Sequence, residues 1–228
     1  VIENLLGKYE SLSSHITVTK KNPDVFPTFT SQYTSEDVPN NSLIVECGDK
    51  SRYISYNDIY LADVDYTTYS YVYSFDGEGA ITSAIDYVIS DELPKVYTLE
   101  GHGEEFLPSE FQTQIEKENI ELASFSLLNT DKIPEDVDAL LIYAPQSDIS
   151  EEEAALLEDY LTDGGKLLVI AGPTEDGTLT NLYSVLGAYG VEAADGIVVE
   201  SDREHYAFQQ PYILLPDISS SEITDPLL

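Results

Sequence analysis

Residues 139–170 have the sequence ALLIYAPQSDISEEEAALLEDYLTDGGKLLVI. Two short apolar runs, 139–143 and 166–170, enclose a segment whose apolar residues recur at helical spacing. Ser150 and Glu153 form a capping box, which predicts that this helix begins directly after Ser150. Strands that are apolar along their whole length, and that are joined through an amphipathic helix, are typical of a parallel sheet covered on both faces.

The same alternation of strand and helix extends in both directions from this stretch. A short apolar strand at 96–99 is followed by a helix that begins near Pro108, and a second strand is expected at 122–128. A last helix is expected at 182–190, and an upstream helix begins at Gly79. We therefore predict an α/β domain at 79–228 with a mainly parallel sheet, flavodoxin-like or glutamine-amidotransferase-like. If its strand order is 2-1-3-4, the loops after the first and third strands lie side by side.

The N-terminal region has a different pattern. Residues 1–12 carry apolar side chains on one helical face, and 16–18 alternate like a short strand. The segment 42–55 predicts two strands joined at Gly48-Asp49, a two-residue hairpin signal. Residues 1–60 are thus expected to form a small separate α+β unit.

The intervening segment, 61–78, is rich in Asp and Tyr and is expected to be a linker. Asp63 and Asp65 suggest a calcium-binding loop of the EF-hand type. That loop requires a glycine where Thr68 stands and a bidentate glutamate where Ser74 stands. The sequence therefore argues against a calcium site in this segment.

The chain is strongly acidic, with 10 basic and 43 acidic residues and a formal net charge of −33. Binding to nucleic acid or to an anionic lipid surface requires Lys and Arg to neutralise phosphates, so neither is an expected partner. The acidic residues occur in every segment, which indicates a heavily solvated surface. A specific cationic partner is the alternative interpretation.

The sequence contains none of the common signatures of catalysis or cofactor binding. Cys47 is the only cysteine, so a CxxC redox or zinc pair is impossible, and we expect it to be a small core residue on the face of Leu43 and Val45. No G-x-S-x-G, G-x-G-x-x-G or Walker A motif is present. We expect no cofactor, no metal, no catalytic residue and no enzymatic activity.

The best-placed candidate site consists of two polar loops that follow the first and third strands of the predicted sheet. Ligands bind at the carboxyl ends of strands, where the strand order reverses, so these loops should be adjacent. His102 beside Glu104 admits three interpretations, namely a structural turn, a binding site, or an acid/base or metal-ligand pair. The candidate ligand- or partner-binding residues are Gly101, His102, Gly103, Glu104, Pro145, Gln146, Ser147 and Asp148.

No stretch approaches the length of a membrane-spanning helix, and the chain has no signal peptide. Methionine is absent, Val1 is not a typical natural start, and the tail 223–228 ends without a closing element. We therefore expect the chain to be a fragment from the middle of a longer protein.

Several stretches have a familiar order and spacing, namely 75–85 (FDGEGAITSAI), 95–104 (KVYTLEGHGE), 133–140 (IPEDVDAL), 144–150 (APQSDIS) and 160–168 (YLTDGGKLL). With the segment 9–33 and the strand pair 42–46 and 52–54, they resemble the auxiliary proteins of ABC-type transport systems, typified by the gliding-motility component GldG. The resemblance covers nearly the whole chain.

The resemblance implies a full-length protein that is anchored in the cell membrane by a helix at each end, with this region on the extracytoplasmic side. Its implied partners are the permease and ATPase subunits of an ABC transporter, together with an unknown small ligand. It also implies a degenerate thioredoxin-like fold for the N-terminal unit and an amidotransferase-like sheet without its catalytic triad. The expected function is that of a non-enzymatic auxiliary or binding subunit of an export or gliding-type complex.

Two other functions remain open from the residues alone. A hydrolase or amidase would use a crevice formed by His102, Glu104 and Ser147, with Ser147 in hydrogen-bond reach of the imidazole. A cell-surface module that binds sugars or peptides would use exposed tyrosines, of which the chain has 17 in all.

Overall fold

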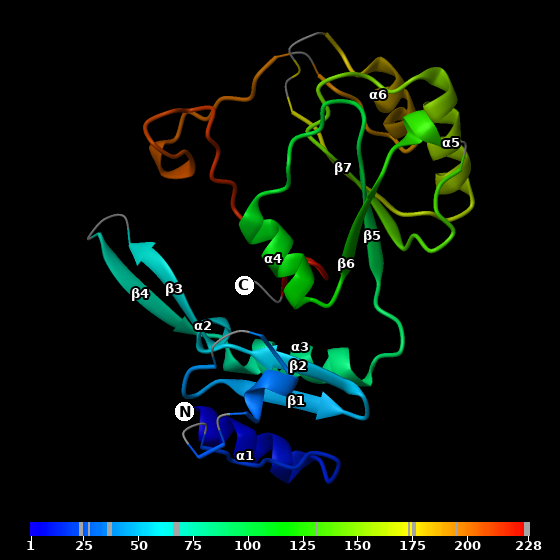
Figure 1. Cartoon of the computed structure of the whole chain (residues 1–228). Coiled ribbons are helices and arrows are strands. Elements are labelled where there is room, and N and C mark those ends of the chain that lie inside the picture. Colours follow the sequence, from blue (N-terminus) through cyan, green and yellow to red (C-terminus); the bar gives the residue numbers. More distant parts are fainter. Residues whose placement is uncertain are drawn as a thin grey trace. The chain divides into compact units, whose positions relative to one another are not determined.

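The computed structural model describes residues 1–22, 25–26, 28–35, 38–65, 69–130, 132–172, 174, 177–194 and 196–225 (Figure 1). Thr68, of the excluded calcium loop, and the end of the tail lie outside these residues. The chain consists of two compact units, Val1–Leu179 and Thr180–Leu228. In the described part of the chain, no helix has the length and apolar character needed to cross a membrane.

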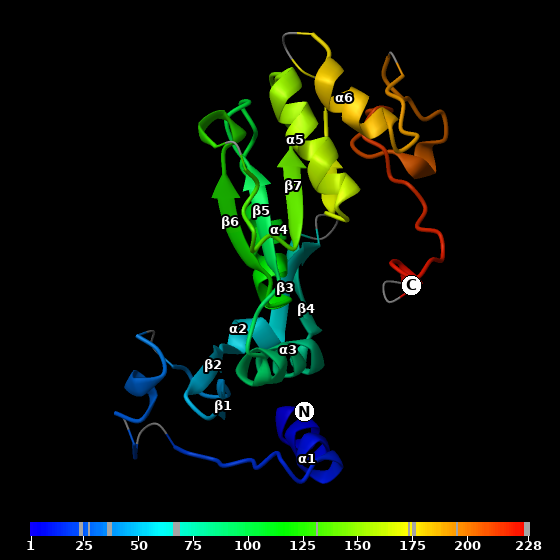
Figure 2. The ribbon, with the colours of Figure 1, turned by 90° about the vertical axis from the view of Figure 1, so that its right-hand side faces the viewer.

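The first unit contains a parallel sheet of four strands: β5 (Lys95–Leu99), β6 (Glu121–Phe125), β7 (Ala139–Tyr143) and β8 (Leu167–Ile170). Their order is β6-β5-β7-β8, which is the order 2-1-3-4 on which the expected adjacency of the two polar loops depends. Helices α4 (Ser109–Lys117) and α5 (Glu151–Thr162) form the crossovers and lie on opposite faces of the sheet (Figures 1 and 2). Right-handed crossovers that move in opposite directions along a sheet produce this arrangement.

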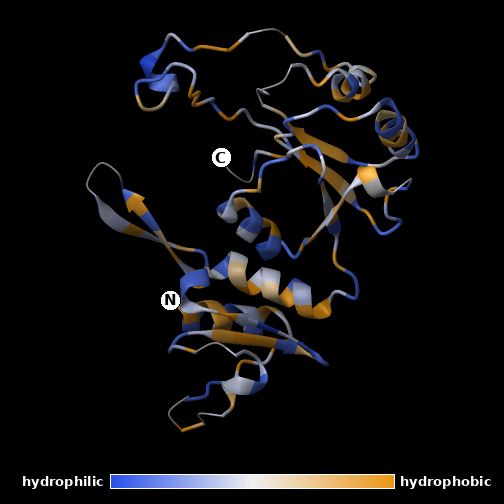
Figure 3. Ribbon diagram, turned by 45° about the horizontal axis from the view of Figure 1, so that its top comes forward, coloured by the Kyte–Doolittle hydropathy of each residue, from blue (hydrophilic) through white to orange (hydrophobic). Residues whose placement is uncertain are grey.

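The centre of this sheet is β7, in which Leu140, Leu141 and Ile142 are buried. Side chains alternate between the two faces of a strand, so consecutive burial requires a cover on both faces. Helix α5 supplies part of that cover with Leu157, which is fully buried. Figure 3 shows the apolar residues concentrated in the sheet strands. The capping box predicted from Ser150 is present, and α5 begins at the next residue.

A second core lies in the N-terminal half of the first unit. Hairpin β1 (Leu43–Cys47) and β2 (Lys50–Ile54) is paired in the predicted register. Helices α1 (Ile2–Leu12), α2 (Tyr56–Ile59) and α3 (Gly77–Ile89) accompany it. The buried residues of this core are Ile54, Ile59, Ile81 and Ala84.

Helix α3 differs from the sequence analysis, which places it in the α/β domain. Its buried residues Ile81 and Ala84 share the core of β2 and α2 instead. The helical period of the sequence shows which face of α3 is apolar, but not which of two nearby apolar surfaces that face contacts. The N-terminal structure therefore extends through Ile89. The elements on either side of the segment 61–78, α2 and α3, share its core.

That segment, which we expected to be a linker, contains most of a second antiparallel hairpin, β3 (Tyr60–Asp65) and β4 (Ser70–Phe75). Residues 16–18, expected to be a strand, have no regular structure. Two threonines beside Ile16 and Val18 give a strand-like alternation, but no described strand pairs with it.

The prediction that Cys47 is buried is wrong, because the residue is exposed. Cys47 is the last residue of β1 and pairs with Lys50 across the turn. Although it shares a strand face with Leu43 and Val45, only those two residues pack against the core. The core ends before the strand does.

The second unit contains one α-helix among its described residues, α6 (Thr180–Gly187), close to the predicted last helix. Beyond α6 the chain has a 3₁₀ turn, Arg203–His205, and a single β-bridge between Tyr206 and Leu214. Two further 3₁₀ turns, Thr30–Gln32 and Leu127–Asn129, lie in the first unit.

The end of α4 is hydrogen-bonded to α3 and β2. Asn119 has φ +58 in the left-handed region, and its Nδ2 donates to the Ser83 carbonyl at 2.7 Å. The Ser83 hydroxyl donates in turn to the Lys117 carbonyl, and Arg52 Nη2 donates to the Glu116 carbonyl at 3.2 Å. The last carbonyls of a helix have no partner within the helix, so these bonds satisfy groups that α4 itself leaves open.

We expect Asn119→Ala to lower the free energy of unfolding by about 1–3 kcal/mol, because it removes a buried hydrogen bond and places alanine in a left-handed conformation. Asn119→Gly should cost less, because glycine adopts this conformation without a steric penalty. Urea unfolding measures both. The control is Asn41→Ala, at an exposed asparagine with φ +69. Equal losses in Asn41→Ala and Asn119→Ala would contradict a role for the Ser83 contact.

The exposure of Cys47 predicts that its thiol reacts readily in the folded protein. In the native protein a thiol reagent should modify Cys47 at a rate within about tenfold of that in denaturant, because the native chain does not shield the sulfur. The absorbance of released thiolate measures the rate. Modification that is slower by several orders of magnitude would show that the end of β1 is covered.

Candidate functional site

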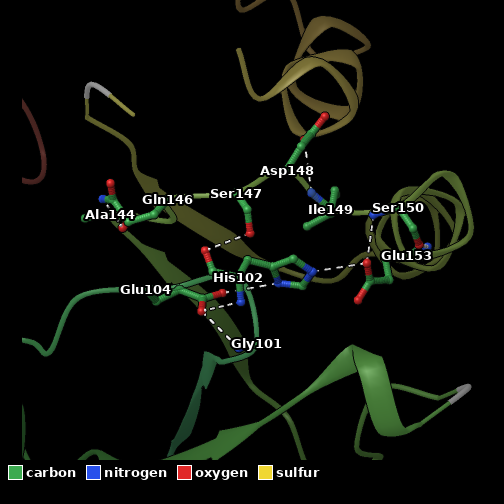
Figure 4. Close-up of polar contacts among 10 residues, drawn as sticks. All are labelled: Gly101, His102, Glu104, Ala144, Gln146, Ser147, Asp148, Ile149, Ser150 and Glu153. Atoms are coloured by element: carbon green, nitrogen blue, oxygen red, sulfur yellow. Dashed lines mark hydrogen bonds and ion pairs between the residues drawn. The ribbon is translucent and has the colours of Figure 1, made fainter. Parts of the chain in front are cut away.

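The structure brings the two predicted loops together at the carboxyl edge of the sheet, which we define as residues 101–104 after β5 and 144–148 after β7 (Figure 4). The carbonyl oxygen of His102 accepts hydrogen bonds from the backbone N–H groups of Gln146 and Ser147, both at 2.9 Å. The Ser147 hydroxyl donates to the same oxygen at 3.1 Å. The predicted adjacency of the loops is therefore confirmed, and one carbonyl group links them.

The glycines of the first loop are required by backbone geometry. Gly101 has φ +125, and a Cβ atom there would lie 2.7 Å from Leu128 Cδ1. Gly103 has φ +74, and its Cβ would lie 3.1 Å from Gln146 Cβ. Side chains rarely adopt such φ values. Glycine at these two positions lets the chain turn after β5 while it packs closely against Leu128 and Gln146. This is what a structural turn, one of the three interpretations of the loop, requires.

His102 itself is almost completely buried and lies between two carboxylates (Figure 4). Its Nε2 donates to Glu153 Oε2 at 3.2 Å, and its Nδ1 lies 3.4 Å from Glu104 Oε1. Both carboxylate side chains are more than nine-tenths buried. We call this group of three residues the His102 bridge.

Backbone hydrogen bonds hold both carboxylates of the His102 bridge in place. Glu104 Oε2 accepts from the N–H groups of Gly101 at 3.0 Å and of His102 at 2.8 Å. Glu153 Oε2 accepts from the N–H of Ser150 at 2.7 Å, which is the reciprocal bond of the capping box. The loop after β5 and the first turn of α5 are therefore connected through one imidazole.

The electrostatics favour a charged bridge. The hydrogen bond with Glu104 raises the pKa of His102 despite the opposing effect of burial. Burial alone would raise the pKa of Glu104, but the imidazole and two backbone N–H groups lower it overall. For Glu153, burial is again outweighed, here by the Ser150 N–H and by His102, so its pKa is also lowered. An imidazolium between two carboxylates is the favoured state.

The predicted site residues differ in accessibility. Gly101, Gly103 and Ser147 are exposed, whereas Glu104, Gln146 and Asp148 are half-buried. His102 and Pro145 are buried, so neither presents a side chain to solvent. The Asp148 carboxylate accepts from the N–H of Ile149 at 3.0 Å. The accessible surface of this edge is mainly backbone, together with Ser147 and parts of Gln146 and Asp148.

Glu153 belongs to the site, although the sequence analysis identified it only as a helix cap. Its distance from His102 along the chain gives no signal for the contact. The relevant clue was its place in the first turn of the helix that follows β7, the strand beside β5. A helix that begins at the carboxyl edge directs its first-turn side chains toward that edge.

Among the described residues of this edge, the Ser147 hydroxyl and the His102 ring do not form the hydrogen-bonded nucleophile–base pair of serine hydrolases. Ser147 Oγ donates to the backbone of His102, not to its ring. No group of three His, Cys, Asp or Glu side chains within the described ranges could hold a metal ion. A hollow of about 450 Å³ between α3 and the end of α4 is lined by Arg52, Asp86 and Asn119 among others, and it includes none of the predicted site residues.

The His102 bridge predicts a stability contribution that depends on pH. Because the folded pKa of His102 is raised, its contribution is complete below the ordinary value of 6.5 and is lost as pH rises through the folded pKa. The glutamates, with lowered pKa values, contribute fully above their ordinary 4.5 and lose this contribution in acid. The contribution is therefore largest between these two values.

The variant His102→Gln removes the charge. We expect it to be less stable than the parent by about 1–3 kcal/mol in that window, with a difference that shrinks toward both acid and alkaline pH. Urea unfolding at a series of pH values measures the difference. His15→Gln, at an exposed histidine, is the matched control and should show no such maximum. A difference that is constant with pH would argue against an ionised bridge.

Comparison with known proteins gives one match. No curated protein and no solved structure matches the chain. A family model described as "ABC-type uncharacterized transport system" matches residues 93–212, more than half of the 228-residue chain. This range contains the parallel sheet and both loops of the carboxyl edge. The chain therefore belongs to the family of auxiliary proteins associated with ABC-type transport systems.

Proposed function

We propose that this chain is a non-enzymatic binding or scaffolding subunit of an ABC transport complex. It works on the extracytoplasmic side of the cell membrane, beside the permease and the ATPase. Family membership supports the association with transport. The resemblance to proteins of the GldG type supports the location and the two named partners.

One observation carries the non-enzymatic part of the proposal. The polar groups of the carboxyl edge are used to hold the edge together, because Ser147 donates to a backbone carbonyl and His102 lies buried between Glu104 and Glu153. A general base must reach the proton of its substrate or nucleophile. The imidazole here has both ring nitrogens directed at carboxylates, and its raised pKa favours a state that cannot accept a proton.

The same observation gives the edge a shape suited to binding. Two loops are fixed by three hydrogen bonds to one carbonyl group and by the buried His102 bridge. A surface whose backbone is held in advance loses less conformational entropy when a partner docks. We assign contact with a partner to the half-buried Gln146 and the exposed Ser147, and we assign to His102 the role of positioning them.

The hydrolase alternative is tested by activity. The purified chain should show no turnover of ester, amide or glycoside substrates above a buffer blank, because the edge lacks a directed nucleophile. His102→Ala and Ser147→Ala are the diagnostic variants. A robust activity that both variants lose would overturn the non-enzymatic proposal.

The scaffolding role is tested by association. The protein should co-purify with the permease and the ATPase of an ABC transporter from its own cell. Gln146→Ala/Ser147→Ala should weaken this association about tenfold, because both side chains lie at the contact. The matched control is Ser31→Ala/Gln32→Ala, an exposed pair of the same residue types in the N-terminal half. Equal association of both double variants would refute the assignment of the contact to this edge.

A further inference from the structure

Hairpin β3–β4 has two chemically different faces. Residues that pair directly across an antiparallel ladder point to the same face. The observed register therefore gives one face to Leu61, Asp63, Asp65, Ser70, Val72 and Ser74. The other face, which we call the aromatic face, consists of Tyr60, Ala62, Val64, Tyr71, Tyr73 and Phe75.

The aromatic face is fixed at its base and open along its length. Tyr60 stacks on Tyr56 with ring centroids 4.8 Å apart, and Phe75 packs against Tyr60 at 5.3 Å. Farther along, Tyr71 and Tyr73 are 70% and 65% exposed. Figure 1 shows the hairpin as a separate two-stranded ribbon that extends from α2. Contiguous exposed aromatic residues of this kind mark a site of interaction.

The backbone of β4 also has an open edge. In the described part of the chain β4 pairs only with β3, and all six of its residues are exposed. Isolated two-stranded ribbons are marginally stable in water, and proteins usually protect exposed strand edges with charged side chains or prolines. Residues 70–75 contain neither. An added strand would satisfy this edge and would extend the aromatic face.

The surrounding charge has one sign. From Tyr53 to Pro94 the chain contains no Lys, Arg or His, whereas it contains eight acidic residues, among them Asp63 and Asp65 of the hairpin. A partner with the same charge would be repelled, and this includes a second copy of the chain at −33. A cationic partner would be attracted, and tyrosine rings themselves favour Lys and Arg.

We propose that β4 accepts an extended segment of a partner protein in which apolar and basic residues alternate. The segment pairs with the open edge of β4 as a third strand. Its apolar side chains continue the aromatic face beside Tyr71 and Tyr73, and its Lys or Arg side chains lie on the face of Asp63. This inference stands apart from the carboxyl edge and from the proposed transport role.

The probe is an acetylated, amidated peptide of alternating lysine and valine, about seven residues long, the length of a typical strand. Three matched peptides separate the contributions. Glutamate in place of lysine reverses the charge, serine in place of valine removes the apolar face, and a central proline in place of valine blocks strand pairing. Calorimetric titration into the 228-residue chain measures each dissociation constant at low and high salt.

Threonine substitutions test the face directly, because threonine retains a high preference for strands. Tyr71→Thr/Tyr73→Thr removes two rings from the aromatic face, and Val72→Thr changes the opposite face of the same strand. Circular dichroism and urea unfolding establish that each variant is folded. Tyr71→Phe/Tyr73→Phe keeps the rings and should bind like the parent, even if the threonine pair disturbs the hairpin.

The expected result is binding of the lysine–valine peptide that weakens with salt and falls about tenfold or more in Tyr71→Thr/Tyr73→Thr, but not in Val72→Thr. The glutamate, serine and proline peptides should bind the parent protein no more tightly than the lysine–valine peptide binds Tyr71→Thr/Tyr73→Thr. Equal binding of the lysine–valine and proline peptides would overturn strand addition. Self-association of the chain in sedimentation, or binding to neutral lipid vesicles, that depends on Tyr71 and Tyr73 would assign the face to another occupant and overturn the proposal.

Discussion

The burial of β7 on both faces is the constraint on which the first unit depends. Leu140, Leu141 and Ile142 are consecutive and buried, so the strand must lie inside a sheet with cover above and below. Helix α5 supplies part of that cover with Leu157. Because β5 and β7 are parallel neighbours, the chain reversals that follow them lie at one edge. The proximity of the two polar loops is a consequence of hydrophobic burial elsewhere in the sheet.

At that edge the same atoms serve local and long-range structure. Glu153 Oε2 accepts the Ser150 N–H within the capping box and also the Nε2 of His102 from the other loop. The Glu104 carboxylate accepts from the N–H of Gly101 within its own turn, and it also lies beside Nδ1 on the opposite side of the imidazole ring. Buried charges are tolerated when they are paired and hydrogen-bonded, and here backbone N–H groups donate to Oε2 of each carboxylate. The two loops and the first turn of α5 are consequently held together through one imidazole.

The sequence was sufficient for those features that depend on local patterns. Continuous apolar strands and the Ser150 capping box predicted the parallel sheet and the start of α5, whereas the strand order was a condition taken from flavodoxin-like folds. Features that depend on a choice between distant surfaces were missed: α3 packs on β2, Cys47 lies beyond the core, and Glu153 contacts His102. The hairpin β3–β4 was missed for another reason. Its Asp and Tyr content suggested a linker, although Asp63 and Asp65 alternate with Ala62 and Val64 and lie on one face of the ribbon.

The hydrogen bonds at the end of α4 have a consequence for how the first unit unfolds. Asn119, Ser83 and Arg52 connect a helix of the parallel sheet to the separate N-terminal core. Loss of the N-terminal core would remove the Ser83 partner of both the Lys117 carbonyl and the Asn119 side-chain amide. The two cores are thereby coupled and should melt in one cooperative transition, so that amide hydrogens in β1 and in β7 exchange with similar protection instead of as independent foldons.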